Sequence, residues 1–324
     1  MFTSFQDYLA ALKPKLDEAF KRQLSILLGS ITMRDAASFM GTLEAGKKIR
    51  GCLSCMISDA LGGTLESAIP RAIAVELIQA ASLIHDDFVD QDTVRGNRPA
   101  AWTLEGARRA VLIGDVIFAT AIKMMNDLSR EDGVAVSRAI AQVSAGALHE
   151  PLDPLTLTRE IKSHRWSDQL YEKIIHLKTG ILFGTACHLG AIAAGADEIL
   201  GEIIYRYGLR IGEAYQIADD LKEVKQHLLR RSIYPEQMVA LAPTFLYFVR
   251  EMRPYILIVL QGECLEFDES IAEFLDRAVK LMEHEIEQRL QSAVSEIEVD
   301  FPKNEYRELA RRTPWDLIRM FNES

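Results

Sequence analysis

The longest stretch without proline in this 324-residue chain lies between Pro154 and Pro235, and its 80 residues are rich in Leu, Ile, Ala, Glu, Lys and Arg. Proline breaks helices, whereas these residues favour them. Residues 71–90 carry an apolar stripe at helical spacing, and similar spacing recurs at 203–224 and 271–294. No βαβ unit and no series of hairpins is evident. The sequence therefore predicts an all-α fold.

Segment boundaries are weak along the whole chain. Short loops are predicted at 61–64, 95–99, 150–154 and 300–304, and none of them resembles a Gly/Ser-rich or proline-rich linker. A chain of this size can bury roughly 75% of its unfolded surface in one body. We therefore expect one helical domain over residues 1–324.

Composition excludes several classes of protein. The chain has 37 Lys and Arg against 47 Asp and Glu, a net charge of −10, which argues against sequence-independent binding of nucleic acid. Four cysteines are too few for a disulfide scaffold, so a reducing compartment is expected. No signal peptide is evident, and charges interrupt the apolar stretch at 241–262. The sequence predicts a cytoplasmic protein without a transmembrane segment.

Two acidic clusters are the strongest chemical signal. On a helix at about 100° per residue, Asp86 and Asp90 lie about 40° apart, and Gln79 falls within about 20° of Asp86. A second cluster repeats this design, with an amide and three carboxylates within about 100° of arc. Its members are Gln216, Asp219, Asp220 and Glu223.

Carboxylates gathered in this way favour a divalent cation. Two like charges about 4 Å apart repel by about 4 kcal/mol at an effective dielectric constant near 20. Oxygen ligands without thiolates favour Mg²⁺, which takes one or two carboxylates together with substrate phosphates. Two facing clusters thus indicate a bound diphosphate. The alternative is that each cluster is a solvated helix end, and the matching spacing of the two clusters argues against it.

Basic residues flank these clusters and supply the counter-charge that an anion requires. They occur in three short segments: Gly46-Lys47-Lys48-Ile49-Arg50-Gly51, Arg95-Gly96-Asn97-Arg98-Pro99 and Lys178-Thr179-Gly180. A metal phosphohydrolase built on His85 and Asp86 is disfavoured, because that class needs a further histidine upstream and all other histidines lie downstream.

Taken in order, these motifs resemble those of the trans-isoprenyl diphosphate synthases, or polyprenyl synthetases. The family pattern is Gly-Lys-x-x-Arg, DDxxD, Lys-Thr-Gly, and DDxx(D/E) preceded by Gln, and residues 114–118 resemble its Gly-Asp segment. The resemblance extends from about residue 40 to residue 225, and the last hundred residues add little.

The resemblance implies an all-α bundle around a deep central cavity, usually in a homodimer. It implies Mg²⁺-dependent, head-to-tail elongation of an allylic diphosphate by isopentenyl diphosphate. The implied metal ligands are Asp86, Asp87, Asp90, Asp219, Asp220 and Glu223. The residues implied for the allylic diphosphate are Arg95, Lys178 and Gln216, with Thr179 stabilising the cation. Those implied for isopentenyl diphosphate are Lys47, Arg50 and Gln79.

The sequence departs from the family pattern at two places. Gly96 replaces the second of two adjacent arginines, for which Arg98 is the alternative contact. The basic, glycine-rich flap after the second acidic motif is missing, and Lys225, Arg230 or Arg231 are the candidate substitutes. These departures leave two alternatives open: a noncatalytic subunit of a heteromeric synthase, and a class I terpene cyclase. Retention of Lys47, Arg50 and Gln79 favours elongation over cyclisation.

Small residues precede the first acidic motif, where family members that stop early carry aromatics. Ala80, Ala81 and Ser82 leave the expected pocket floor open, which predicts a product of about C20 or longer, with Ala81 and Ser82 in the chain-length pocket. The alternative is that these small residues only allow close helix packing.

Overall fold

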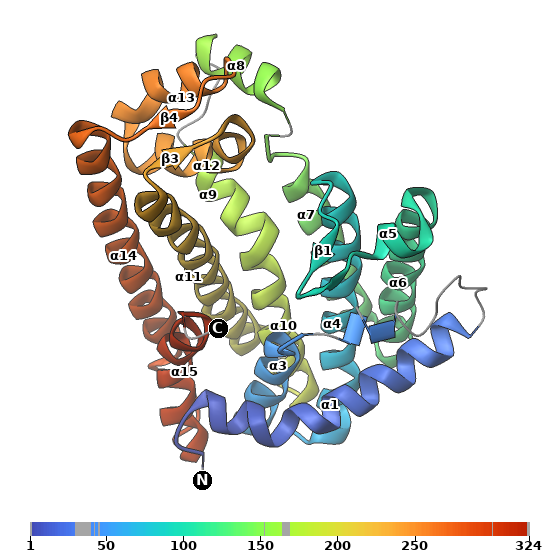
Figure 1. Ribbon diagram of the computed structural model, residues 1–324. Helices are drawn as coiled ribbons and strands as arrows, with labels where there is room; N and C mark the ends of the chain where they lie inside the picture. The colour runs from blue at the N-terminus through green and yellow to red at the C-terminus, as the bar shows by residue number, and fades with distance from the viewer. Residues whose placement is uncertain are drawn as a thin grey trace.

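The computed structural model describes residues 2–29, 40–41, 43–44, 46–151, 153–163, 169–299 and 301–322. Long helices dominate it (Figure 1), which confirms the all-α prediction. The first half contains α1 (Phe5–Leu28), α3 (Ile49–Ala60), α4 (Leu65–Val89), α5 (Ala101–Glu105), α6 (Ala107–Leu128), α7 (Arg130–Ala147) and α8 (Pro154–Lys162).

The second half begins with α9 (Leu170–Ile175), a π-helical turn η1 (His176–Gly180), α10 (Ile181–Ala193) and α11 (Glu198–Arg230). It continues with α12 (Pro235–Phe248), a 3₁₀ turn η2 (Arg250–Met252), α13 (Arg253–Val259), α14 (Glu269–Ile297) and α15 (Glu305–Asn322). Two short antiparallel pairs are present: a local hairpin of β1 (Val94–Arg95) with β2 (Arg98–Pro99), and a pair of more distant strands, β3 (Ser232–Ile233) with β4 (Leu265–Glu266).

Side-chain caps explain where the principal helices begin. Ser, Thr and Asp side chains satisfy the free amides of a first turn, as Thr64 does for α4 and Asp197 does for α11. Thr64 therefore starts α4 six residues before the predicted stripe at 71–90. The other two predicted stripes lie wholly inside α11 and α14.

Two clusters of buried apolar side chains form the core. The first joins α1, α3, α4, α6 and α10, and the second joins α12, α13 and α14. Helix α11 belongs to both, with Tyr207 in the first cluster and Ile217 in the second. In Figure 1, α1 crosses the lower ends of α3 and α4, and its first amide, on Phe5, donates to Asp316 of α15 at 2.9 Å. The single-domain organisation stays a prediction.

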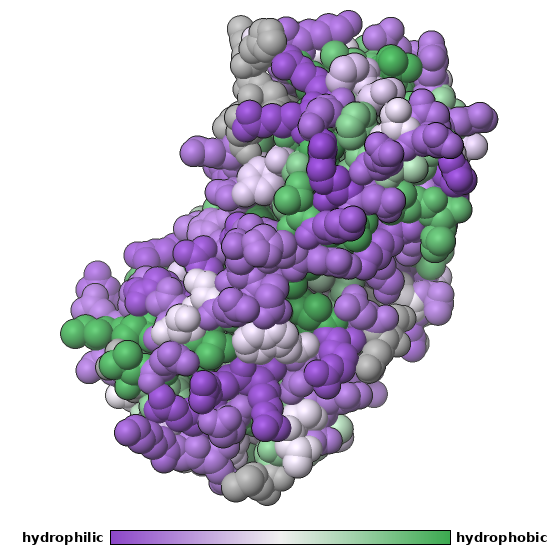
Figure 2. Space-filling view, turned by 90° about the vertical axis from the view of Figure 1, so that its left-hand side faces the viewer, coloured by the Kyte–Doolittle hydropathy of each residue, from purple (hydrophilic) through white to green (hydrophobic). Residues whose placement is uncertain are grey.

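The apolar faces of these helices point inward. On α14, Ile271, Leu275, Ala278 and Met282 are buried at helical spacing, and the side of the molecule that this helix borders is largely hydrophilic (Figure 2). By length and composition α4 alone among the described helices is apolar enough to cross a membrane, but 67% of its most apolar window is buried inside the protein. That burial is typical of a core helix.

Candidate active site

A cavity of about 550 Å³ opens between α4, η1 and α11. Ten of the residues singled out in the sequence line it: Arg50, Gln79, Ser82, Asp86, Asp90, Arg95, Lys178, Thr179, Gln216 and Asp219. A pocket of about 250 Å³ shares four of these and adds Glu150, Tyr171, Asp220 and Glu223. Side chains from separate parts of the sequence are thus collected around one space.

The first wall of the cavity is the acidic cluster at the C-terminal end of α4. Asp86 and Asp90 lie one helical turn apart and both face the cavity. Burial raises the pKa of Asp86 to about 6, against the opposing charge of Lys178. Asp87 lies about 100° further round the helix, is 2% exposed and forms an ion pair with Arg95. It therefore lies outside the residues that line the cavity.

The second wall of the cavity is the acidic cluster on α11. Asp220 accepts hydrogen bonds from the Tyr171 hydroxyl at 2.6 Å and from the Gln216 amide at 3.0 Å. Burial raises the pKa of Asp220 to about 6. Burial, together with Asp220 and Asp219, raises the pKa of Glu223 to about 7. Burial therefore disfavours the charged form of both carboxylates.

Lys178 lies between the two walls. Its ammonium donates to both oxygens of Glu150, at 2.7 and 2.8 Å. Although burial lowers the pKa of Lys178, the attraction of Glu150 and of Asp86 raises it overall. Next to it, the Thr179 hydroxyl donates to Gln216 at 2.6 Å. The π-helical turn therefore presents one cation and one hydroxyl to the cavity.

The oxygen donors of the two acidic walls are of the kind that Mg²⁺ prefers. The phosphate oxygens of a substrate would have to supply the remaining ligands. Among the described residues, no group of three or more His, Cys, Asp or Glu could hold a metal ion. All the donors are oxygens, and burial raises the pKa values of Asp86, Asp220 and Glu223, so a bound cation would offset the cost of keeping these carboxylates ionised. Magnesium commonly combines one or two carboxylates with phosphate oxygens. The arrangement suits a cation shared with a bound diphosphate.

The cavity also has a cationic and an apolar part. The Arg50 guanidinium stacks over the Phe183 ring at 4.5 Å, and its buried Nε has no hydrogen-bond partner. Apolar side chains that line the same cavity include Leu83, Phe118, Val143 and Phe321. An anionic group and a hydrocarbon chain can therefore occupy one site.

A family model described as polyprenyl synthetase matches residues 36–228. The chain belongs to the polyprenyl synthetase family. This confirms the resemblance to the trans-isoprenyl diphosphate synthases.

Relatives of this chain carry several product names. It is 33% identical over 189 residues to a (2E,6E)-farnesyl diphosphate synthase of Mycobacterium tuberculosis, matching 55% of this chain and 49% of the relative. It is 32% identical over 180 residues to a geranylfarnesyl diphosphate synthase of Methanosarcina mazei, matching 56% of this chain and 58% of the relative. It is 29% identical over 223 residues to heptaprenyl diphosphate synthase component 2 of Geobacillus stearothermophilus, with 68% and 65% matched. The chain spans about half the length of the first of these relatives.

Solved structures share the fold of this chain. A decaprenyl diphosphate synthase from Rhodobacter capsulatus aligns with a TM-score of 0.73 and 21% identity, covering 98% of this chain and 99% of that one. A heptaprenyl diphosphate synthase from Staphylococcus aureus aligns with a TM-score of 0.74 and 17% identity, covering 96% and 98%. At these identities the likeness shows the fold alone.

The departure at Gly96 has a structural explanation. Gly96 and Asn97 both have positive φ, +55° and +62°, and they form the two-residue turn between β1 and β2. Tight hairpins favour glycine and asparagine at such positions. Arg98 follows on the exposed side of the turn, where its guanidinium packs against Gly41. Arg95 lines the cavity and Arg98 does not.

Two further predicted residues lie away from the cavity lining. Lys47 is largely exposed. Partial burial of its ammonium and the nearby charge of Lys222 lower its pKa. Its neighbour Lys48 instead has a left-handed backbone and turns inward over the Phe20 ring, at 3.9 Å. Ala81 is fully buried in the core, whereas Ser82 reaches the cavity.

Sequence reasoning missed several residues of the site. Glu150, the partner of Lys178, lies in a predicted loop, and Tyr171, the partner of Asp220, is in no family motif. Phe321 lies in the last hundred residues, which contain no family motif, yet it lines the cavity. Each meets the site only through tertiary packing, so no local pattern identifies it.

Proposed function

We propose that this protein is a prenyl diphosphate synthase. It elongates an allylic diphosphate with isopentenyl diphosphate, head to tail, and releases diphosphate. The observation that carries the proposal is the shared cavity: Asp86 of α4 and Asp90 at its C-cap face the same space as Asp219 on α11, with Lys178 between them. The proposed product is about C20 or longer.

The leaving diphosphate is the charged part of the reaction. Lys178, Arg95 and Gln216 are proposed to bind and orient it, because they line the cavity beside the acidic walls. The proposed metal ligands are Asp86, Asp87, Asp90, Asp219, Asp220 and Glu223. When bound there, Mg²⁺ would neutralise charge that develops on the departing oxygens. Asp87 would first have to leave its ion pair with Arg95.

Bond changes balance without any further reactant. The allylic carbon–oxygen bond breaks, and its electron pair leaves with the diphosphate. The double bond of isopentenyl diphosphate then forms the new carbon–carbon bond, and a proton passes to the released diphosphate, which restores a double bond. Arg50 and Gln79 are proposed to hold isopentenyl diphosphate on the adjoining part of the cavity, with Lys47 at its rim.

The allylic cation requires protection from water during this sequence. The apolar side chains Leu83, Phe118 and Val143 are proposed to surround the growing chain and exclude solvent. The Thr179 hydroxyl donates to Gln216, so its oxygen lone pairs remain available toward the cation.

The direct test uses purified protein with Mg²⁺, isopentenyl diphosphate and a series of allylic diphosphates, with products measured by mass spectrometry. We expect chain growth with at least one allylic primer, and its loss in Asp86→Ala and Asp219→Ala. No growth with any primer, together with unchanged diphosphate affinity in both variants, would falsify the proposal.

A noncatalytic subunit of a heteromeric synthase is the second candidate. It is favoured by the glycine that replaces a basic side chain at Gly96 and by the missing basic flap. A chain that shows no turnover alone, yet changes the product length of an active partner, would support this candidate over elongation.

The proposed assembly is a homodimer through α6, on which Leu112 and Val116 are 53% and 42% exposed. Exposed apolar faces of this kind favour association. Analytical ultracentrifugation of the protein and of Val116→Glu tests this, with a dimer and a monomer expected, respectively. The proposed compartment is the cytoplasm, in keeping with four free cysteines.

A further inference from the structure

The π-helical turn η1 separates two cavities. Lys178 and Thr179 face the active-site cavity, whereas His176 of the same turn lines a second cavity of about 870 Å³. Single π-turns inside helices are locally wider than an α-helical turn and often occur at functional sites. The orientation of Lys178 and Thr179 thus depends on what fixes this turn from the opposite side.

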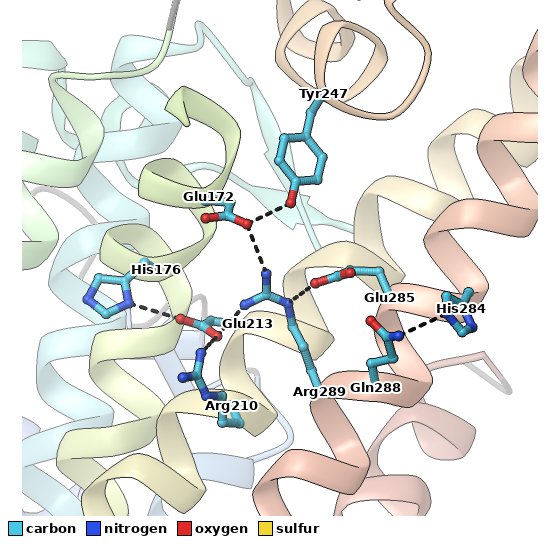
Figure 3. Close-up of polar contacts among 9 residues, drawn as sticks. All are labelled: Glu172, His176, Arg210, Glu213, Tyr247, His284, Glu285, Gln288 and Arg289. Carbon is cyan, nitrogen blue, oxygen red and sulfur yellow. Dashed lines mark hydrogen bonds and ion pairs between the residues drawn. The ribbon is translucent and has the colours of Figure 1, made fainter. Parts of the chain in front are cut away.

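Glu213 of α11 hydrogen-bonds to the turn on that side. It is 3% exposed and accepts hydrogen bonds from His176 Nδ1 at 2.9 Å and from Arg210 at 3.1 Å. It also forms an ion pair with Arg289 of α14 (Figure 3). Burial alone would raise the pKa of Glu213, but the hydrogen bond from His176 and the two arginines lower it overall. The carboxylate is therefore ionised and acts as an acceptor, so His176 donates through Nδ1.

Arg289 connects Glu213 to two other helices. Its side chain is 12% exposed, and it pairs with Glu285 of α14 at 2.8 Å and with Glu172 of α9 at 3.7 Å. The Tyr247 hydroxyl of α12 donates to Glu172 at 2.6 Å, as Figure 3 shows. Removing one member of such a buried network leaves charges without partners, which is costly.

Close packing leaves the turn little freedom to move away from α11. A Cβ on Gly180 would lie 3.0 Å from Cγ of Glu213, and a Cβ on Gly212 would lie 2.9 Å from Cα of Gly180. One turn further along α11, Gln216 accepts from Thr179. Helix α11 therefore holds both ends of the turn, through Glu213 at His176 and through Gln216 at Thr179.

We infer that Glu213 is a positioning residue for catalysis: through His176 it fixes the π-helical turn that presents Lys178 and Thr179 to the leaving diphosphate. The inference rests on the proposed function for its catalytic consequence, while the anchoring itself is a property of the fold. A misplacement of about 1 Å at a reacting group can cost about 100-fold in rate.

The first test compares Glu213→Gln with Glu285→Gln, a matched control that loses a partner of Arg289 but does not contact the turn. Both variants are checked for intact folding by thermal unfolding. We expect Glu213→Gln to lower kcat by about tenfold or more. KM for isopentenyl diphosphate should stay within about threefold, because that binding energy comes from α3 and α4. Glu285→Gln should keep kcat within about threefold.

The second test asks whether the donor on residue 176 is what matters. Asparagine places an N–H close to the position of histidine Nδ1, so His176→Asn should retain most of kcat, whereas His176→Ala should lose about tenfold or more. Equal activity in both variants, matching the parent protein, would overturn the inference, and so would equal loss in both.

The third test does not depend on turnover. Amide hydrogen exchange at residues 176–180 should be faster by about tenfold or more in Glu213→Gln than in the parent protein or in Glu285→Gln. Unchanged exchange overturns the inference even if the protein elongates prenyl chains. Conversely, a parent protein that makes no product overturns the proposed function, while faster exchange in Glu213→Gln still supports the anchoring.

Discussion

The Lys178 ammonium lies within hydrogen-bonding distance of both carboxylate oxygens of Glu150, at 2.7 and 2.8 Å. This ion pair holds the lysine at the junction between the acidic stripe on α4 and the acidic stripe on α11. The lysine is thereby available to a diphosphate that enters between the two stripes.

Replacing this lysine should reduce catalytic efficiency. Lys178→Met removes a charge-assisted hydrogen bond, for which the cost is about 1.5 to 3 kcal/mol. We expect kcat/KM for the allylic diphosphate to fall by about 10- to 150-fold. The matched control is Lys173→Met, five residues earlier on α9, which lines the second cavity and should change kcat/KM by less than about threefold. Equal effects of the two substitutions would contradict this role for Lys178.

Magnesium and diphosphate should stabilise the protein together and not separately. The described carboxylates form no group that could hold a metal ion unaided. Magnesium and diphosphate therefore each need the other in order to bind. At about 100 times the dissociation constant, a ligand adds about 2.7 kcal/mol to the free energy of unfolding. Thermal unfolding with Mg²⁺, with inorganic diphosphate and with both should show a clear rise in Tm only for the combination. A full rise with Mg²⁺ alone would argue for a preformed metal site.

Product length should respond to Ser82 and not to its neighbour. Ser82 lines the cavity, whereas Ala81 is fully buried in the core. Ser82→Phe should therefore shorten the product. Ala81→Phe should instead overpack the core and destabilise the protein, by about 1 to 3 kcal/mol. Mass spectrometry of products and denaturant unfolding distinguish the two effects. An unchanged product distribution in Ser82→Phe would remove the chain-length role of this position.

The two arginines of the β1–β2 hairpin should differ in importance. Arg95 lines the cavity and pairs with Asp87, while Arg98 lies on the exposed side against Gly41. We expect Arg95→Ala to lower kcat/KM by about tenfold or more, and Arg98→Ala to stay within about threefold. A large loss in Arg98→Ala would show that the hairpin rearranges when substrate binds and brings this side chain inward.

Acid should diminish the stabilising effect of Glu213. Its pKa lies below the ordinary value of 4.5, so its contribution is complete above that value and is lost as the pH falls through the lowered pKa. At pH 7, Glu213→Gln should lower the free energy of unfolding by about 3 kcal/mol. The difference in free energy of unfolding between the variant and the parent protein should become smaller only below about pH 4.5. Urea unfolding at several pH values measures this, with the surface variant Glu283→Gln as a control. If this difference in free energy of unfolding stays constant down to pH 3, the stabilising role of ionised Glu213 is contradicted.

Helical periodicity was enough to predict the stripes on α4 and α11, because the position of a residue around a helix follows from spacing alone. It correctly grouped Asp86 with Asp90. Spacing could not show that Asp87 forms an ion pair with Arg95, because this pair depends on how the β1–β2 hairpin, eight residues further along the chain, packs against α4.

Contacts between distant segments were beyond sequence reasoning. Glu150 reaches Lys178 across 28 residues, and Arg289 reaches Glu213 across 76. Arg289 and Phe321 also show that the last hundred residues contribute to the surroundings of the site, although they carry no family motif. Such pairs are set by how helices pack, and a single sequence contains no local signal for them.

Helix α11 runs for 33 residues without interruption through both buried clusters. Sharp kinks in helices occur at proline, at π-bulges or where a backbone hydrogen bond is interrupted, and residues 198–230 contain no proline. The distance between Glu213 and Asp219 along it is accordingly constant. We therefore expect any movement that admits a substrate to the cavity to occur in the shorter segments around its opening and not in α11.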